Sequence, residues 1–235
     1  MTLRWIPLAL VAALALTASC DGDAKPAAQA PAPTSAAPSP TPPASPTRSG
    51  ADKIDQIKRG VLVNDDVTTY SGGAPATESR TETLFGPCSP PVIALTGVQF
   101  TWGQVWKDKD RFYFVTSVVQ GAATGDPQAV VAEIRTTLPG LCVNYSAAGR
   151  IVDFKKELTV PALAGVAAQY GWCLRYQFDD GDKAKFNTLC GVIMVRKVAD
   201  LTLVANVRVS AFDPGDAEKA VLDLAPKAAA RLMAA

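Results

Sequence analysis

A run of Pro, Ala, Ser and Thr over residues 21–49 is the feature that most limits what this chain can fold into. Proline recurs there at nearly every third or fourth position. Such a segment cannot bury enough apolar surface to offset the entropy lost on folding, and its prolines favour an extended chain. The sequence therefore predicts a disordered tether over residues 20–50. About 185 residues, Ala51 to Ala235, remain for one folded domain.

The residues before the tether follow the order of a secretory signal peptide over residues 1–19. A basic start, Met1 to Arg4, precedes an almost wholly apolar stretch from Trp5 to Ala18. This stretch is shorter than the ~20 apolar residues that a membrane-spanning helix needs. The run Leu16-Thr17-Ala18-Ser19-Cys20 resembles a bacterial lipobox, although Thr17 stands where Leu or Val is usual. We therefore expect export and a lipid on Cys20 that anchors the protein to the outer face of the cell membrane.

The composition excludes several kinds of chemistry. The chain has no histidine, which excludes Ser-His-Asp and Cys-His nucleophiles and imidazole metal ligands. Its 23 basic and 22 acidic side chains nearly cancel, so no charge field favours nucleic acid. We therefore expect no nucleic-acid partner, no metal, no cofactor and no enzymatic activity.

Four cysteines lie in the predicted domain, an even number in a chain bound for an oxidising compartment. They are Cys88, Cys142, Cys173 and Cys190, and their spacing matches no zinc-binding pattern. A hairpin that turns near Gly181-Asp182 places Cys173 directly opposite Cys190, where the two β-carbons are close enough for a disulfide. The sequence therefore predicts a Cys173–Cys190 bond, which leaves Cys88 to pair with Cys142.

Apolar periodicity predicts an α+β domain. Strands are expected at Leu95–Lys107, Phe112–Gln120, Cys142–Tyr145, Ile151–Val160, Val166–Asp179, Cys190–Val198 and Leu201–Ala211. Helices are expected at Lys53–Arg59, from Pro127 to a stop at Pro139-Gly140, and from Asp213 to Met233 with a kink at Pro226.

Two segments, Gln99–Leu138 and Cys190–Leu224, share the order hairpin, Asp-Pro helix start and amphipathic helix. This order predicts an antiparallel sheet built from hairpins, with the two main helices packed on one of its faces.

Aromatic residues at even spacing are the candidate ligand-binding residues. Trp102, Gln104 and Trp106 share one side of a predicted strand, and Tyr113 lies on the partner strand. Tyr170 and Trp172 are spaced in the same way on another strand. If all of them share a face they line a groove for a lipid, glycan or peptide. The alternative is that they fill the core beneath the helices.

The mature domain resembles the extracellular lipoprotein and sensor-like domains of actinobacteria, some of which form the outer region of membrane-bound serine/threonine kinases. The matching features are the following: Leu62–Asp66, Trp102–Trp106, Val118-Val119-Gln120 before the Asp-Pro helix, the two cysteine pairs, and the closing hairpin and helix from Cys190. The resemblance implies an α+β domain whose groove binds an unidentified extracellular molecule. It supplies no catalytic residue.

These features predict a lipid-anchored envelope protein that binds a small molecule or an envelope protein without catalysis. One alternative is a cell-wall enzyme that uses carboxylates, for which Glu133, Asp153 and Glu157 are the candidates by elimination. Their spacing does not match the carboxylate pair of a glycosidase. The other alternative is a purely structural interaction module.

Overall fold

The computed structural model of this chain describes residues 49–79, 84–85, 94–107, 114–142, 145–147, 150–180 and 183–235. These residues belong to one compact unit, Pro46–Ala235. Residues 1–48, with the predicted signal peptide, Cys20 and tether, lie outside the described residues, as do Cys88 and Tyr113. The expectations for them stay predictions.

The described residues include four helices: α1 (Gly50–Arg59), α2 (Asn64–Ser71), α3 (Pro127–Cys142) and α4 (Pro214–Ala234). Side chains near their first residues fix where two of them begin. At α1 the Ser49 hydroxyl accepts the backbone N–H of Asp52, whose carboxylate accepts the N–H of Ser49. At α4 the Asp213 carboxylate accepts the N–H groups of Gly215 and Asp216, at 2.7 and 3.1 Å.

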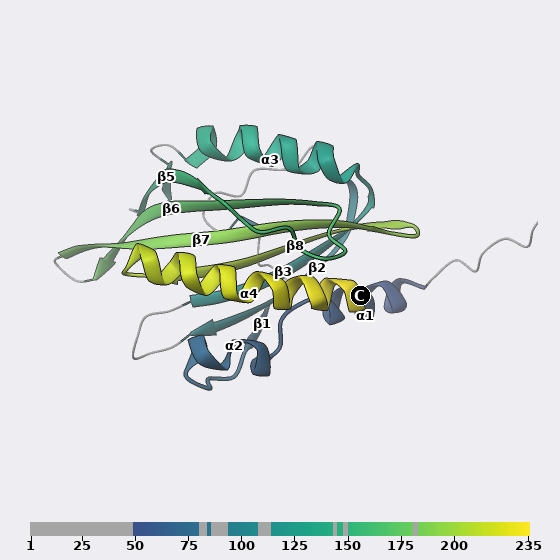
Figure 1. The fold of residues 1–235 in the computed structure, drawn as a ribbon, viewed down its shortest axis with the longest axis horizontal. Coiled ribbons are helices and arrows are strands. Elements are labelled where there is room, and N and C mark those ends of the chain that lie inside the picture. Colours follow the sequence, from purple (N-terminus) through teal and green to yellow (C-terminus); the bar gives the residue numbers. More distant parts are fainter. Residues whose placement is uncertain are drawn as a thin grey trace, which may run out of the picture. The chain divides into compact units, whose positions relative to one another are not determined.

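The strands of the described residues form one antiparallel sheet (Figure 1). They are β1 (Thr77–Ser79), β2 (Thr96–Lys107), β3 (Phe114–Thr124), β4 (Tyr145–Ala147), β5 (Arg150–Leu158), β6 (Ala168–Asp180), β7 (Lys183–Val198) and β8 (Leu201–Ala211). Their order across the sheet is β1-β2-β3-β8-β7-β6-β5-β4. The hairpins β2–β3, β6–β7 and β7–β8 pair neighbours in the chain, so the predicted α+β class and hairpin-built sheet are confirmed.

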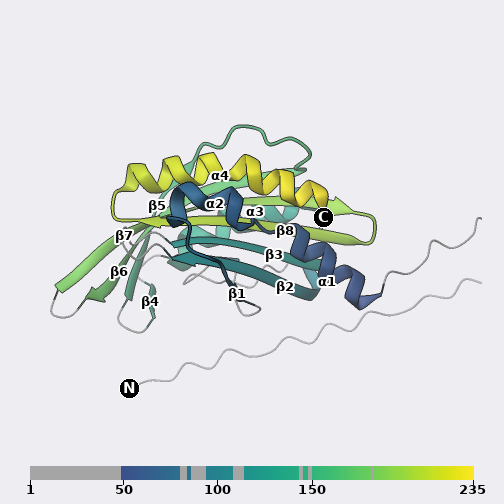
Figure 2. The ribbon, with the colours of Figure 1, turned by 90° about the horizontal axis from the view of Figure 1, so that it is seen from below.

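The two long helices pack on opposite faces of this sheet. Val192 of β7 belongs to a core that includes Leu224 of α4 and residues of α1 and α2; we call this the α4-side core. The next residue along the strand, Ile193, belongs to a second core with Ile134 of α3, the α3-side core. Successive strand residues point to opposite faces, so the two helices are on different sides. Figure 2 shows α1 and α2 beside α4, with α3 behind the strands.

The prediction that both helices cover one face is therefore wrong. Every residue of β8 is buried, from Leu201 to Ala211. A strand with one face in water alternates apolar and polar residues, whereas one covered on both faces reads as a near-continuous apolar run. The apolar run Val192–Val195 of β7 carries the second signal, whereas β8 alternates and its polar residues Asn206, Arg208 and Ser210 are buried as well. A strand buried on both faces requires a cover on each, and each of the two long helices covers one face.

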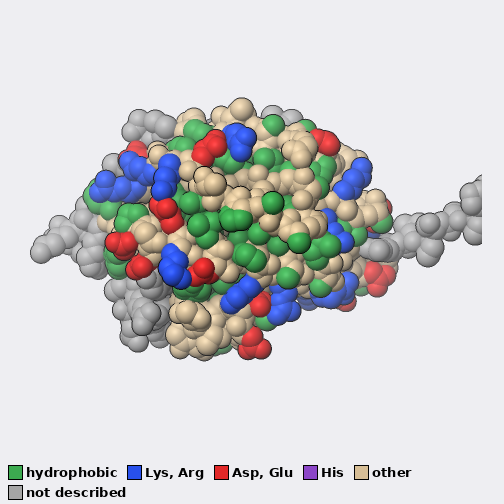
Figure 3. All heavy atoms as spheres, viewed as in Figure 1, with side chains coloured by type: hydrophobic (Ala, Val, Ile, Leu, Met, Phe, Trp, Pro, Cys, Tyr) green, Lys and Arg blue, Asp and Glu red, His purple; other side chains and the backbone are tan. Residues whose placement is uncertain are grey.

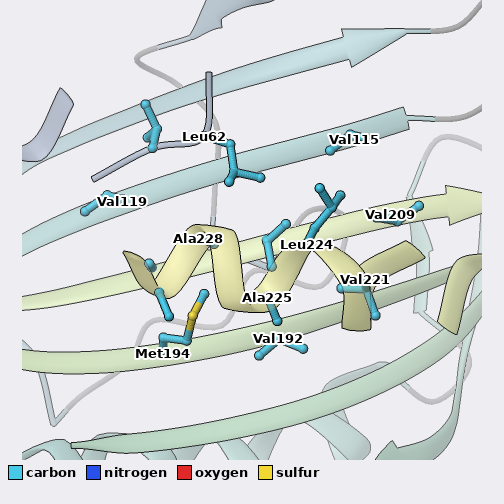
Figure 4. Close-up of a cluster of buried hydrophobic side chains, with 14 of the residues drawn as sticks. Leu62, Val115, Val119, Val192, Met194, Val209, Val221, Leu224, Ala225 and Ala228 are labelled. Atoms are coloured by element: carbon cyan, nitrogen blue, oxygen red, sulfur yellow. The ribbon is translucent and has the colours of Figure 1, made fainter. Parts of the chain in front are cut away.

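The α4-side core brings the helix close to the sheet through small residues. Figure 4 shows Ala225 and Ala228 of α4 among the larger side chains of the strands, with Val221 and Leu224 beside them. All four are at most 2% exposed. Full burial of a side chain such as Leu224 contributes about 1.5–3 kcal/mol to the free energy of unfolding. This packing holds α4 along β7 and β8.

The predicted disulfide between Cys173 and Cys190 is confirmed. The two residues are direct partners in the β6–β7 register, with their Cα atoms 4.1 Å apart. The bond lies in the α4-side core, where both residues are at most 1% exposed. It is the one disulfide formed between described residues. The Cys88–Cys142 bond stays a prediction because Cys88 is not described.

Element boundaries differ from the predictions at several points. The strand predicted at Cys142–Tyr145 spans Tyr145–Ala147, and β7 begins at Lys183 instead of Cys190. α3 continues through Pro139 to Cys142, so the predicted stop at Pro139-Gly140 is wrong. Proline fixes φ near the value that a helix uses, although at Pro139 it removes one N–H donor and its ring crowds the carbonyl one turn earlier. Two short elements, α2 and β1, were not predicted. The closing helix was predicted from Asp213 to Met233 and spans Pro214–Ala234.

We expect Gly191→Ala to lower the free energy of unfolding by about 1–3 kcal/mol, because it overpacks a filled core. A Cβ atom on Gly191 would lie 2.6 Å from Cζ2 of Trp172, whose side chain is fully buried. Gly140→Ala is the matched control, since a Cβ there meets nothing within 4 Å and the position is helical. Chemical denaturation measures both; equal stability of the two variants would contradict the packing described.

Candidate functional site

Two hollows open on the described surface. The larger, of about 290 Å³, lies beside α3, β5 and β6, and we call it the tyrosine hollow. Its lining residues are Arg135, Glu157, Leu158, Thr159, Val160, Gln169, Tyr170 and Gly171. The smaller, of about 240 Å³, lies beside α2 and β2 and is lined by Val63, Asn64, Pro75, Ala76, Glu78 and Gln104; we call it the asparagine hollow. Ligand sites of small molecules begin at about 300 Å³, so the tyrosine hollow suits a small ligand.

Gln169 builds one wall of the tyrosine hollow by holding the loop between β5 and β6. Its side-chain oxygen accepts the backbone N–H of Leu163 at 3.0 Å. Its side-chain nitrogen donates to the carbonyls of Val160 and Pro161, at 3.1 and 2.8 Å. The loop backbone thus uses both N–H donors of the amide and one lone pair of its oxygen. Gln169 fixes the wall and leaves other groups to meet a ligand.

α3 supplies the opposite side of the hollow. Gln128, in its first turn, donates to the carbonyl of Ala167 at 2.9 Å and so ties the helix to the same loop. Arg135 follows seven residues later, about two helical turns on, and therefore lies on the same side of α3. Its Nε is 3.5 Å from Oε1 of Glu157 on β5. The hollow therefore has one cation and one carboxylate at its rim.

Tyr170 is the one lining residue with a buried polar atom that has no hydrogen-bond partner in the described part of the chain. Its side chain is only 2% exposed, and the Arg135 guanidinium lies 5.2 Å from the centre of its ring. Burial, helped by the Glu157 carboxylate, raises the pKa of Tyr170 from 10.0 to about 12, against the lowering effect of Arg135. The phenol is therefore neutral at ordinary pH and presents an O–H donor.

Further polar groups lie buried on the same side of the sheet. Trp172 Nε1, Asn187 Oδ1 and Asn206 Oδ1 also lack a hydrogen-bond partner among the described residues. The β6, β7 and β8 registers place all three on the α3 side, because their strand partners belong to the α3-side core or pack against it. Most buried polar groups in folded proteins are bonded to protein or to ordered water. The α3 side of the sheet therefore has buried polar groups in addition to the charged side chains at the rim of the tyrosine hollow.

A bonded network adjoins these groups at the far end of the same face. The hydroxyls of Tyr176 and Ser210 are 2.7 Å apart, and Asn187 Nδ2 donates to both, at 3.1 and 3.3 Å. Arg208 is 3% exposed on the same face of β8. A buried network of this kind holds side chains in fixed positions because breaking one bond leaves a costly unsatisfied group.

One polar group of the asparagine hollow, the Asn64 side-chain oxygen, is already bonded twice. Asn64 Oδ1 accepts both the indole N–H of Trp106, at 2.8 Å, and the backbone N–H of Ala76, at 3.1 Å. Gln104, a predicted ligand-binding residue, is half-buried and lines this hollow. The bonds of Asn64 explain how the polar tip of Trp106 is satisfied in the core.

The aromatic groove expected from the sequence does not form. Trp102 and Trp106, 5% and 0% exposed, belong to the α4-side core, where Lys58 lies 4.4 Å from the centre of a Trp102 ring. Tyr170 and Trp172 belong to the α3-side core on the other face. Residues at even spacing on one strand lie on the same side of the sheet. Such spacing does not show whether residues on two separate strands lie on the same side. Of these residues, Tyr170 alone lines the tyrosine hollow, and Tyr113 lies outside the described residues.

The three candidate carboxylates of the enzyme alternative are spread over two elements and bonded. Glu133 of α3 accepts the backbone N–H of Ala94 at 2.6 Å. Asp153 lies 3.4 Å from Lys155, and Glu157 pairs with Arg135. Of the three, the tyrosine hollow includes Glu157 alone. Within the described ranges, no three His, Cys, Asp or Glu residues are grouped so that they could hold a metal ion.

The surface carries mixed charge. Figure 3 shows basic and acidic side chains interspersed over the face that carries α4. No helix in the described part of the chain is both long and apolar enough to cross a bilayer.

We predict that Tyr170→Phe removes part of the loss of stability at alkaline pH. The folded pKa, about 12, exceeds the unfolded value of about 10, so between these values the unfolded chain loses its proton first. The contribution of Tyr170 to the free energy of unfolding is complete below about pH 10 and is lost as the pH rises towards 12. A pKa difference of two units corresponds to about 2–3 kcal/mol. Denaturation of both proteins across this range measures the difference. Parallel curves would show that the Tyr170 phenol is not desolvated.

Comparisons with known proteins add two distant structural likenesses. No protein-family model matches this chain, and no curated protein sequence matches it. A crystal structure of LpqN, described as involved in cell envelope biogenesis of Mycobacterium tuberculosis, aligns at 16% identity with a TM-score of 0.34, over 77% of this chain and 94% of LpqN. The extracellular domain of PknH from Mycobacterium tuberculosis aligns at 12% identity with a TM-score of 0.43, over 74% of this chain and 96% of that domain. At these scores neither likeness establishes what this chain does.

Proposed function

We propose that this chain is an exported, lipid-anchored envelope protein whose folded domain binds a small polar molecule in the tyrosine hollow. The Tyr170 phenol carries this proposal. It is a buried O–H donor without a partner among the described residues, and it lines a hollow of about 290 Å³. Leaving such a group unbonded costs about 1–3 kcal/mol. A ligand that offers an acceptor oxygen recovers this cost on binding.

The walls of the hollow are suited to binding because bonded groups hold them in place. Gln169 fixes the loop, Gln128 ties that loop to α3, and the β5–β6 pairing holds Glu157 opposite Trp172. A site whose walls are fixed before binding loses little conformational entropy when the ligand arrives. The arrangement therefore favours capture of one small molecule over a broad protein contact.

Binding without catalysis is favoured by the state of the same groups. A tyrosine with a raised pKa stays protonated, so it is a poor base and a poor nucleophile at neutral pH. Glu157 is paired with the Arg135 guanidinium. The groups at the hollow can donate and accept hydrogen bonds, which is what recognition requires.

The tether sets how far the domain reaches from the membrane. About 30 residues separate Cys20 from Ser49, which begins α1 through its capping box. A chain of this length spans roughly 30 Å as a flexible coil and roughly 90 Å as an extended polyproline helix. The proposed anchor thus keeps the hollow close to the membrane.

Native mass spectrometry of the full chain, extracted from its membrane in mild detergent, tests both parts of this proposal. We expect a protein mass that starts at Cys20 and carries acyl chains, and an additional small mass that is lost on denaturation. Cys20→Ser removes the acyl mass. Tyr170→Phe weakens ligand binding about tenfold, as expected for one lost hydrogen bond of about 1.4 kcal/mol, and so lowers the ligand-bound fraction.

Tyr176→Phe is the matched control for the ligand, because Tyr176 lies on the same strand, is bonded to Ser210 and does not line the hollow. An unmodified Cys20 in the membrane-extracted protein would refute the anchor. Ligand retention that is equal in wild type and Tyr170→Phe would refute the site.

A further inference from the structure

The rim of the tyrosine hollow has one positive and one negative side chain that can be separated at little cost. Arg135 and Glu157 are 55% and 53% exposed, and their closest atoms are 3.5 Å apart. Pairs this exposed contribute at most about 1 kcal/mol and are screened by salt. A ligand that satisfies both side chains therefore gains more than opening the pair loses.

Three side chains of the hollow are available to form hydrogen bonds with such a ligand. Arg135 contacts Glu157 through Nε, and a guanidinium has further N–H donors. Glu157 accepts at one oxygen in this pair and has a second. The Tyr170 ring lies under the Arg135 guanidinium, and its buried hydroxyl has no partner among the described residues. The Gln169 amide has no donor left for a ligand, because the loop backbone uses both of its N–H groups.

We infer that the ligand of the tyrosine hollow is a small zwitterion, with one carboxylate and one ammonium group, such as a free amino acid. This inference rests on the function proposed above. The carboxylate accepts hydrogen bonds from Arg135 and the Tyr170 hydroxyl, and the ammonium donates to Glu157. Arg135 thereby pairs with the ligand carboxylate instead of Glu157, and Glu157 pairs with the ligand ammonium instead of Arg135.

Ligands with one charge fit the rim less well. A carboxylate without an ammonium places a second negative charge beside Glu157, and an ammonium alone places a second positive charge beside Arg135. Like charges at such distances repel, and the partial exclusion of water strengthens the repulsion. The balanced charge of the rim therefore selects a ligand whose own charges balance.

Three probes of nearly equal size test the inference with the full chain in detergent, by saturation-transfer NMR and calorimetry. Alanine carries both charges, N-acetylalanine the carboxylate alone, and alaninamide the ammonium alone. We expect saturable binding of alanine, with affinities for the other two weaker by about ten- to hundredfold, the effect of losing one charge-assisted hydrogen bond.

Conservative variants then assign each charge. Arg135→Gln should weaken alanine and N-acetylalanine, and Glu157→Gln should weaken alanine and alaninamide, each by about tenfold or more. Lys155→Gln and Asp153→Asn are the matched controls. They form a pair on the same strand, with 45% and 42% exposure and a 3.4 Å separation, and they do not line the hollow. We expect these two variants to bind alanine as wild type does.

Two results would overturn the inference. One is binding of N-acetylalanine or alaninamide as tight as that of alanine. The other is an absence of alanine binding by a protein that retains a co-purified mass sensitive to Tyr170→Phe, which would refute the zwitterion and leave the proposed function intact. If neither alanine nor a co-purified mass is bound, both proposals fail.

Discussion

Burial of the central strands on both faces is the constraint on which the rest of this structure depends. β8 has no exposed residue, and β7 is buried from Asn187 to Val195. Backbone groups in such strands cannot turn to water, so they need neighbouring strands on each edge and a cover on each face. The covers differ: α4 packs with α1 and α2 through small apolar residues, whereas α3 covers a face that includes buried polar side chains. The proposed binding site lies on the α3 side.

The tyrosine hollow depends on the loop that joins β5 to β6. The loop after β5 packs Val160, Leu163 and Val166 against the α4-side core, yet its end at Ala167 is bonded to α3. It thus links the two covers. Gln169 fixes this loop, and the next residue, Tyr170, points to the α3 side. Two neighbouring residues of one strand therefore have different roles: Gln169 holds the wall and Tyr170 presents the donor.

Local sequence signals predicted the hairpins, both long helices and the Cys173–Cys190 bond, because each depends on spacing within one segment. The face covered by each helix was not predicted correctly. The apolar run Val192–Val195 of β7 carried that information, but β8 alternates apolar residues with Asn206, Arg208 and Ser210, which is the pattern of a strand with one face in water. The site was predicted in part. Tyr170 was named with the aromatic residues and Glu157 with the carboxylates, but their meeting depends on the β5–β6 register and on α3. Arg135 was missed, since a lone arginine on a helix carries no signal until its neighbours are known.

The most direct measurement is a crystal structure of the full chain purified from its membrane without removal of bound molecules. Our account predicts density for a small non-protein molecule in the tyrosine hollow, with an acceptor oxygen about 2.5–3.0 Å from the Tyr170 hydroxyl. A Tyr170 hydroxyl that is instead bonded to a protein group, beside a hollow that holds only water, would contradict it.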